Sequence, residues 1–254
     1  MGKSYVFVNQ KGGVGKTTSA INIGAYLAEA GKSVLLVDFD SQANLSSGVG
    51  VSEKAAKPGV YELISGLASI DEVIRPAPGK GLSVIPSHID LSGAAVELIE
   101  HEERDFFLKR ALEPVRERFD FILIDCPPSL GVLTLNGIAA ADEVLIPMQC
   151  EYFAMEGLSH LLQAVKRIQK SLNPLLEVGG IFFTMYDPRT RLAQQVVKEV
   201  STYFTSKVFT TIIPRNVRLS EAPSHGLPIT IYDPLCSGAK AYKSLALEVL
   251  GRGD

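Results

Sequence analysis

A glycine-rich segment near the N-terminus, residues 9–18, has the sequence NQKGGVGKTT. Glycines let backbone N–H groups turn toward an anion, and a lysine followed by a hydroxyl supplies a cation and a metal ligand. The usual G-x-x-x-x-G-K-[ST] pattern has glycine where Gln10 stands, and Lys11 is one lysine more than phosphate binding requires. The segment therefore predicts a phosphate-binding loop and leaves Lys11 to be explained.

The positions of this loop predict contacts with ATP and Mg²⁺. Lys16 is expected to reach the β- and γ-phosphates, Thr17 to bind Mg²⁺ through its hydroxyl, and Thr18 to reach the α-phosphate. A glycine-rich turn with an incidental lysine is the alternative, but seven specified positions match by chance on the order of once in 10⁸ windows. The expected nucleotide contacts are Gly12, Gly13, Val14, Gly15, Lys16, Thr17 and Thr18.

Three aspartates follow apolar runs and could complete the site. Asp125 ends the run FILID and is expected to hold a water of the Mg²⁺ shell. Asp38 and Asp40 follow a second run, within VDFDSQ. Because phosphoryl transfer to water needs a group that orients the nucleophile, Asp40 is the candidate for that catalytic role and Asp38 for support near the metal. The alternatives are an ordinary aspartate at a strand end and aspartates that cap a helix or turn.

These residues need a scaffold that brings them together. Short runs rich in Val and Ile alternate with longer segments of helical period, which predicts one doubly wound α/β domain over residues 1–254, with a mostly parallel sheet and helices on both faces. Ligands bind at the carboxyl ends of the strands in such a sheet. Residues 48–81 are expected to be an insertion of short helices. The predicted strands are residues 5–8, 33–37, 82–85, 121–124, 143–146, 178–185 and 211–213, and the predicted helices are residues 16–30, 102–119, 130–140, 154–171, 190–204 and 238–250.

The composition narrows the class of protein. No apolar run approaches the roughly 20 residues that span a bilayer, and the three cysteines lack metal-type spacing, so we expect a cytoplasmic protein without membrane contact. The formal net charge is −3, which argues against a globally basic nucleic-acid binder. Residues 160–254 nevertheless hold 12 Lys or Arg against 7 Asp or Glu, so a DNA-binding surface is expected as a patch in this part.

Six segments in order, KGGVGKTT, VDFDSQAN, FILIDCPPSLG, QCEYFAMEG, TMYDPRT and IPRNVRLSEAPSHG, resemble the ParA/Soj chromosome-partitioning ATPases. These are P-loop NTPases of the deviant Walker A class, and the resemblance covers essentially the whole chain. It implies a slow ATPase that forms a homodimer when ATP is bound, binds double-stranded DNA non-specifically on the nucleoid, and is stimulated by DNA and a ParB-type protein. Where many members have D-L-D-P-Q-G-N, residues 38–44 are DFDSQAN, so the turn after the acids is expected to be set differently.

The resemblance also implies roles for individual residues. It makes Lys11 the signature lysine, a catalytic cation that crosses the dimer interface, as an arginine finger does; a phosphate contact within its own chain is the alternative. It points to Met185, Pro214 and Asn216 as base contacts, although a turn-forming Asn216 is an equal alternative. It favours Arg189 and Arg218 for DNA binding, with a solvated charged face as the alternative.

Four other functions compete with chromosome partitioning. A MinD-type membrane ATPase should end in a basic amphipathic helix, whereas residues 242–254 are short of bulky apolar and basic residues. An amide-forming ligase or an iron-sulfur carrier could share the loop, but the basic C-terminal bias and the cysteine pattern disfavour them. A ParA-like protein that positions a different cargo cannot be separated by sequence, because the partner chooses the cargo.

Overall fold

The computed structural model describes residues 2–253, and its central element is a seven-stranded sheet in the order β3-β4-β2-β5-β1-β6-β7. Neighbouring strands are parallel except β3 and β4, which are antiparallel. The predicted doubly wound, mostly parallel sheet is therefore confirmed. The strands are β1 (Lys3–Phe7), β2 (Val34–Asp38), β3 (Arg75–Pro76), β4 (Leu82–Ile85), β5 (Phe121–Asp125), β6 (Glu143–Gln149) and β7 (Glu177–Thr184).

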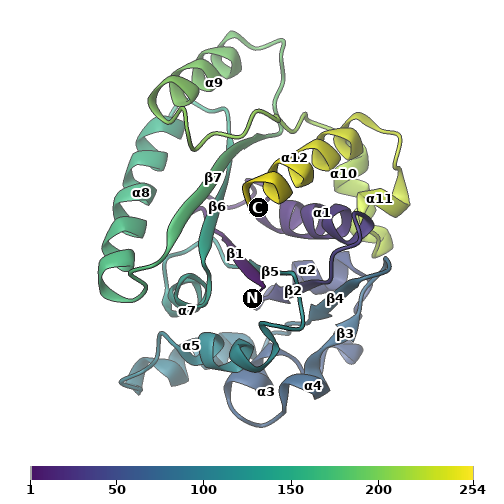
Figure 1. Ribbon diagram of the computed structural model, residues 1–254, viewed down its shortest axis with the longest axis vertical. Helices are drawn as coiled ribbons and strands as arrows, with labels where there is room; N and C mark the ends of the chain where they lie inside the picture. Colours follow the sequence, from purple (N-terminus) through teal and green to yellow (C-terminus); the bar gives the residue numbers. More distant parts are fainter. Residues whose placement is uncertain (1, 254) are drawn as a thin grey trace.

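Helices cover both faces of the sheet (Figure 1). Helices α1, α10, α11 and α12 pack on one face, with α1 and α12 side by side, and α3 to α9 line the other. The helices are α1 (Lys16–Glu29), α2 (Asn44–Gly48), α3 (Val60–Ile64), α4 (Ile70–Val73), α5 (Leu91–Glu97), α6 (Phe107–Leu112), α7 (Val132–Ala140), α8 (Ala154–Ser171), α9 (Arg191–Tyr203), α10 (Val217–Glu221), α11 (Ile229–Tyr232) and α12 (Ser237–Gly253).

The strands are apolar at nearly every position because each face of the sheet has its own core. Along β1, Tyr5 and Phe7 point into the core under α1 and α12, whereas Val6 points into the core under α7. Successive side chains of a strand alternate between faces, so a strand covered on both sides must be apolar throughout. This burial leaves the carboxyl edge of the sheet as the place for polar residues.

Two predicted elements differ from the structure. In place of the predicted helix over residues 102–119, α6 spans only Phe107–Leu112 and is followed by a 3-10 turn at Glu113–Val115. The helix starts late because the Asn136 side chain accepts from Leu108 N (3.2 Å) and donates to Arg104 O (2.6 Å). Residues 211–213 do not form a strand. The Glu248 carboxylate instead accepts from Thr210 N and Thr211 N, both at 2.8 Å, and in place of a strand the structure has isolated bridges on either side, Ile181 with Val208 and Tyr186 with Pro214. In both places a distant side chain, rather than the local sequence, takes the backbone hydrogen bond.

The insertion at residues 48–81 follows the prediction in kind, since it contains α3, α4 and one 3-10 turn before β3. It brings the short strand β3 to the edge of the sheet, which the sequence did not predict. The loop after β1, Asp38 of β2 and Asp125 of β5 meet at one edge of the sheet. Asp125 pairs in register with Asp38 on one side and with Phe7, the last residue of β1, on the other.

Candidate functional site

The loop between β1 and α1 has the backbone shape that its glycines allow. Gly13 and Gly15 have φ angles of 72° and 87°, and Gly15 is the N-cap residue of α1. A side chain disfavours such angles, whereas glycine adopts them freely. A Cβ atom added to Gly12 or Gly13 would meet nothing within 4 Å, so this part of the loop borders open space where an anion fits.

Side chains from two other strands hold this loop in shape. The buried Thr184 hydroxyl, at the end of β7, donates to Val14 O (2.8 Å) and lies 3.2 Å from Met148 O. Gln149, at the end of β6, donates through Nε2 to Gly13 O at 2.9 Å. Sequence analysis missed both residues; the available signal was a polar residue closing an otherwise apolar strand. With these carbonyls occupied, the backbone N–H groups of the loop remain for a ligand.

Lys16 is buried at the start of α1 and turns back onto the loop. Its Nζ donates to Asn9 O (3.1 Å) and to Lys11 O (3.4 Å). Burial lowers the pKa of Lys16, and the charge of Asp125 opposes that shift. The ammonium group therefore lies beside the loop, held by weak carbonyl acceptors that phosphate oxygens would readily replace.

Thr17 and Asp125 form the other side of the loop. The Thr17 hydroxyl donates to Asp125 Oδ2 at 2.6 Å, while Asp125 Oδ1 is buried without a hydrogen-bond partner. Burial and, to a smaller extent, the neighbouring Asp38 carboxylate raise the pKa of Asp125 to about 8. An uncompensated buried carboxylate of this kind is expected where a cation binds.

Asp38 is also fully buried, but its oxygens are occupied. Its Oδ2 accepts from Ser46 N (2.8 Å) and from the Ser46 hydroxyl (2.6 Å), and its Oδ1 lies 3.3 Å from Asp40 N. Burial raises the pKa of Asp38 to about 6, against the hydrogen bonds from Ser46. These contacts make Asp38 an anchor for the loop that follows β2 as well as a neighbour of the predicted metal position.

The donor set fits a magnesium ion. Mg²⁺ prefers oxygen ligands and usually keeps several waters, with one or two protein ligands beside substrate phosphates. Thr17 Oγ1 and the unpartnered Asp125 Oδ1 are such oxygens. Within residues 2–253, no group of three or more His, Cys, Asp or Glu side chains could hold a metal by itself. An ion here would therefore depend on phosphate oxygens and water.

Asp40 lies in the loop between β2 and α2 and is partly buried. Its Oδ1 accepts from Gln42 N at 3.0 Å, and its carbonyl accepts from Ala43 N at 2.9 Å. Ala43 has a left-handed backbone with φ of 53°, a conformation that glycine adopts more readily than alanine. The turn after Asp40 thus holds an alanine in a backbone conformation that costs alanine more than glycine.

The three predicted base contacts lie together. A cavity of about 330 Å³ is lined by Met185, Pro214 and Asn216 and also by Gly15 and Thr18 of the phosphate loop. The side-chain amide of Asn216 is occupied as well, because Oδ1 accepts from Arg218 N (2.9 Å) at the start of α10 and Nδ2 donates to Ser237 Oγ (2.9 Å). Asn216 therefore caps α10 in the wall of the cavity.

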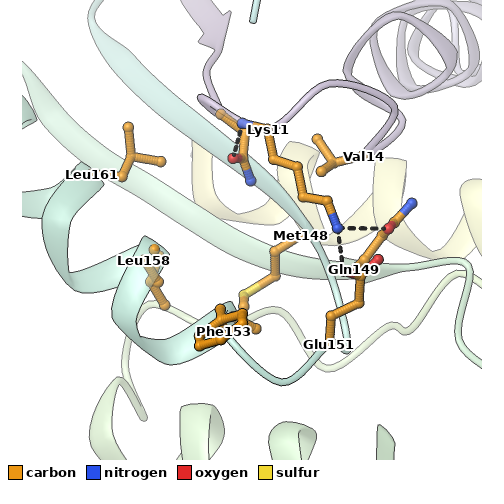
Figure 2. A pocket seen from close by; sticks show the side chains of 11 residues that line it. Lys11, Val14, Met148, Gln149, Glu151, Phe153, Leu158 and Leu161 are labelled. Carbon is orange, nitrogen blue, oxygen red and sulfur yellow. Dashed lines mark hydrogen bonds and ion pairs between the residues drawn. The ribbon is translucent and has the colours of Figure 1, made fainter. Parts of the chain in front are cut away.

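Lys11 extends across the mouth of a second cavity, of about 320 Å³, between the loop and α8 (Figure 2). Its Nζ forms an ion pair with Glu151 and lies 3.5 Å from Gln149 Oε1. The cavity wall below is apolar and includes Met148, Phe153, Leu158 and Leu161. About half of the Lys11 side chain is exposed, and its ammonium group lies against Glu151 and Gln149.

The two arginines predicted to bind DNA are exposed, and each is ion-paired within the chain. Arg189 contacts Asp187 at 2.6 Å, and Arg218 contacts Glu221 at 2.8 Å and Asp233 at 3.4 Å. The Arg189 guanidinium lowers the pKa of Asp187 to about 2. The isolated bridge between Tyr186 and Pro214 brings the two arginine-bearing segments together beyond the carboxyl end of β7.

Comparison with known proteins gives full-length matches. Residues 2–178 match the family described as AAA domain. The chain is 64% identical to the chromosome-partitioning ATPase Soj of Treponema pallidum (strain Nichols), over 99% of this chain and 98% of the relative. It is 52% identical to the sporulation initiation inhibitor protein Soj of Bacillus subtilis (strain 168), over 100% of both chains.

Solved structures give the same fold. Cobyrinic acid a,c-diamide synthase from Mycobacterium smegmatis, with bound ADP and magnesium, superposes with a TM-score of 0.86 at 36% identity, over 98% of this chain and 94% of that chain. The cell division ATPase MinD of Pyrococcus furiosus superposes with a TM-score of 0.83 at 26% identity, over 99% of both chains. Since the partitioning proteins are far more similar in sequence, the chain belongs to the ParA/Soj family of chromosome-partitioning ATPases.

Proposed function

We propose that this protein binds ATP with Mg²⁺ and hydrolyses it slowly, as a switch rather than as a step in making a metabolite. One observation carries this proposal: Gly15 and Thr18 line the same cavity as Met185, Pro214 and Asn216, while Thr17 turns toward Asp125. A base, its phosphates and a metal ion would thus lie in sequence along one edge of the sheet. The ADP and magnesium of the M. smegmatis neighbour support this assignment.

Each residue of the site then has a distinct task in hydrolysis. The loop N–H groups and Lys16 bind the phosphates, and Thr17 with Asp125 holds the metal and its water. Magnesium, when bound, neutralises charge on the β- and γ-phosphate oxygens. Asp40 orients a water so that its oxygen attacks the γ-phosphorus in line as the bond to the ADP oxygen breaks. The products are ADP and inorganic phosphate.

Lys11 gives this site a reason to form a dimer. Because about half of the Lys11 side chain is exposed and its ammonium group pairs with Glu151 at the mouth of the cavity, we propose that it leaves this pair and reaches the phosphates bound by a second subunit when ATP is present. Cations supplied in trans to phosphoryl transfer are worth about 10³ to 10⁵ in rate. A homodimer that lasts only while ATP is intact would then be the output of the switch.

Arg189 and Arg218 are proposed to contact the backbone of double-stranded DNA without reading its sequence. Both arginines lie in the part of the chain where basic residues exceed acidic ones, and both are exposed. Their ion pairs with Asp187 and Glu221 are exposed too, so phosphates can replace the carboxylates at little cost. Such binding would place the ATP-bound dimer on the nucleoid in the cytoplasm.

A ParB-type protein is the proposed partner that triggers hydrolysis, and the chromosome-partitioning role named for the T. pallidum relative supports a partner of this kind. Membrane anchoring of the MinD kind is disfavoured, because α12 buries Tyr242, Leu245 and Val249 in the core against α1. Within residues 2–253, none of the helices is both long enough and apolar enough to cross a membrane.

The decisive experiment measures ATPase rate and mass in solution with DNA, with a ParB-type protein, and with both. The proposal expects a dimer with ATP but not with ADP, and the highest rate when both additions are present. An ATP-independent mass, or a rate that neither addition changes, would refute the switch. A protein that dimerises and hydrolyses ATP but ignores the ParB-type protein would instead position another cargo.

A further inference from the structure

Ser46, the third residue of α2, joins three elements of the site although it touches none of the predicted nucleotide contacts. Its hydroxyl donates to Asp38 Oδ2 (2.6 Å) at the end of β2 and accepts from Ser87 N (2.9 Å) just beyond β4. Its own backbone N–H donates to the same Asp38 oxygen at 2.8 Å. Ser46 is 1% exposed, so water does not compete for these hydrogen bonds.

These contacts close the chain between Asp38 and Ser46 into a ring. Asp38 accepts from Ser46 at one end, and within the ring Ala43 N donates to Asp40 O at 2.9 Å and Gln42 N to Asp40 Oδ1 at 3.0 Å. The ring contains Asp40, which lies only partly buried on a short loop. A carboxylate that must orient water needs its backbone fixed, and the ring is what fixes it.

We propose that Ser46 is a positioning residue for ATP hydrolysis, which holds Asp38 and the Asp40 loop in register with the end of β4. The inference rests on the proposed function, because it assigns Ser46 to the residue that orients the water. Ser46 is not a catalytic residue, since it acts only through Asp38 and the loop.

Removing the hydroxyl has two local consequences. In a Ser46→Ala variant, Asp38 Oδ2 keeps one of its two donors from Ser46, and the buried N–H of Ser87 loses its acceptor. Unsatisfied buried groups loosen the structure around them. The loop carrying Asp40 is expected to open, whereas the phosphate loop keeps its hydrogen bonds from Thr184 and Gln149. Hydrolysis should therefore suffer while ATP binding persists.

Ser87 supplies a matched control from the same network. Its backbone N–H donates to Ser46, but its own hydroxyl is buried without a hydrogen-bond partner. A Ser87→Ala variant thus removes a buried hydroxyl next to Ser46 and leaves the ring intact. Ser46→Thr keeps a hydroxyl at position 46 and serves as the rescue.

The test combines kinetics with amide hydrogen exchange of the nucleotide-free protein. Ser46→Ala should lower kcat about 10- to 100-fold, change the ATP dissociation constant less than threefold, and speed exchange of the amides at residues 40–43. Ser87→Ala should match the wild type in all three, and Ser46→Thr should restore most of kcat. Equal losses in Ser87→Ala, a kcat unchanged in Ser46→Ala, or an ATP affinity that falls as far as kcat would each overturn the proposal.

Two outcomes call for a further variant or measurement. If Ser46→Ala does not fold, Ser46→Cys keeps the side-chain volume with a weaker donor, and it must show the same pattern in smaller degree. If the wild type hydrolyses no ATP, the proposed function fails, but exchange at residues 40–43 still tests the positioning role. Unchanged exchange in the position 46 variants would then overturn that role by itself.

Discussion

The Thr17 hydroxyl lies 2.6 Å from Asp125 Oδ2, and this short hydrogen bond joins the start of α1 to the end of β5. Thr17 Oγ1 is one of the oxygens that we propose for the magnesium site, and the other is the second oxygen of the same carboxyl group, Asp125 Oδ1. In the nucleotide-free chain the hydroxyl proton partly compensates a carboxylate that burial makes costly. When Mg²⁺ binds, the site would therefore lose a proton and the hydrogen bond between Thr17 and Asp125 and gain the metal ion.

This arrangement predicts a pH dependence of stability without nucleotide. The pKa of Asp125 is raised in the folded chain to about 8, so between pH 4 and pH 8 the folded state binds a proton that the unfolded state has released. Stability from this group is therefore greatest at low pH and is lost as the pH rises through 8. Thermal unfolding should show Asp125→Asn about 2 kcal/mol more stable than wild type at pH 8.5, and the gap should shrink toward pH 6. A gap that does not vary with pH would contradict the prediction.

The Thr184 hydroxyl should matter for ATP affinity. Thr184→Val keeps the shape of the side chain but leaves Val14 O without its donor, at a cost of about 1–3 kcal/mol. Because the loop then loses its fixed shape, ATP should bind about tenfold more weakly in calorimetry. Thr184→Ser retains the hydroxyl and should bind as wild type does; equal weakening in both variants would refute the assignment.

Lys11 and Glu151 predict opposite effects on dimerisation. Lys11→Ala should abolish the ATP-dependent dimer seen by light scattering and lower hydrolysis about 10³-fold, because the trans cation is lost. Glu151→Gln frees Lys11 from its ion pair and should strengthen the dimer by up to about fivefold, since an exposed pair contributes less than about 1 kcal/mol. Unchanged dimerisation of Lys11→Ala with ATP would rule out the crossing lysine.

The left-handed Ala43 predicts a stabilising substitution. Ala43→Gly removes a Cβ atom from a residue with φ of 53°, which should stabilise the chain by about 1 kcal/mol and raise Tm by about 2–4 °C. Ala164→Gly, in the middle of α8, is the matched control and should lower stability by about the same amount. If both glycines destabilise, the turn is not strained.

DNA binding should depend steeply on salt. If an ATP-bound dimer neutralises about six phosphates, log K should fall against log salt with a slope near −5, and removing Arg189 and Arg218 together should bring the slope to about −2. Lys57→Ala removes an exposed lysine of the insertion, which pairs with Asp90. The salt slope of this variant should equal that of wild type. A flat response of the wild type to salt would remove DNA binding by phosphate contacts.

The sequence by itself determined the fold class and the main parts of the site, because these depend on local patterns. A glycine loop between an apolar strand and a helix, and aspartates at the ends of two apolar strands, have few other structures available. The order of those elements also implied the edge at which they meet, and the register of Asp38 with Asp125 bears that out.

Only the tertiary structure decided how the site is held. Thr184 and Gln149 hold the phosphate loop from strands more than 130 residues away along the chain, and Ser46 ties Asp38 to the end of β4. The start of α6 depends likewise on Asn136, and the loss of a strand at residues 211–213 on Glu248. No local pattern reveals such contacts, because each one exists only after packing brings a polar side chain to a backbone group that burial has cut off from water.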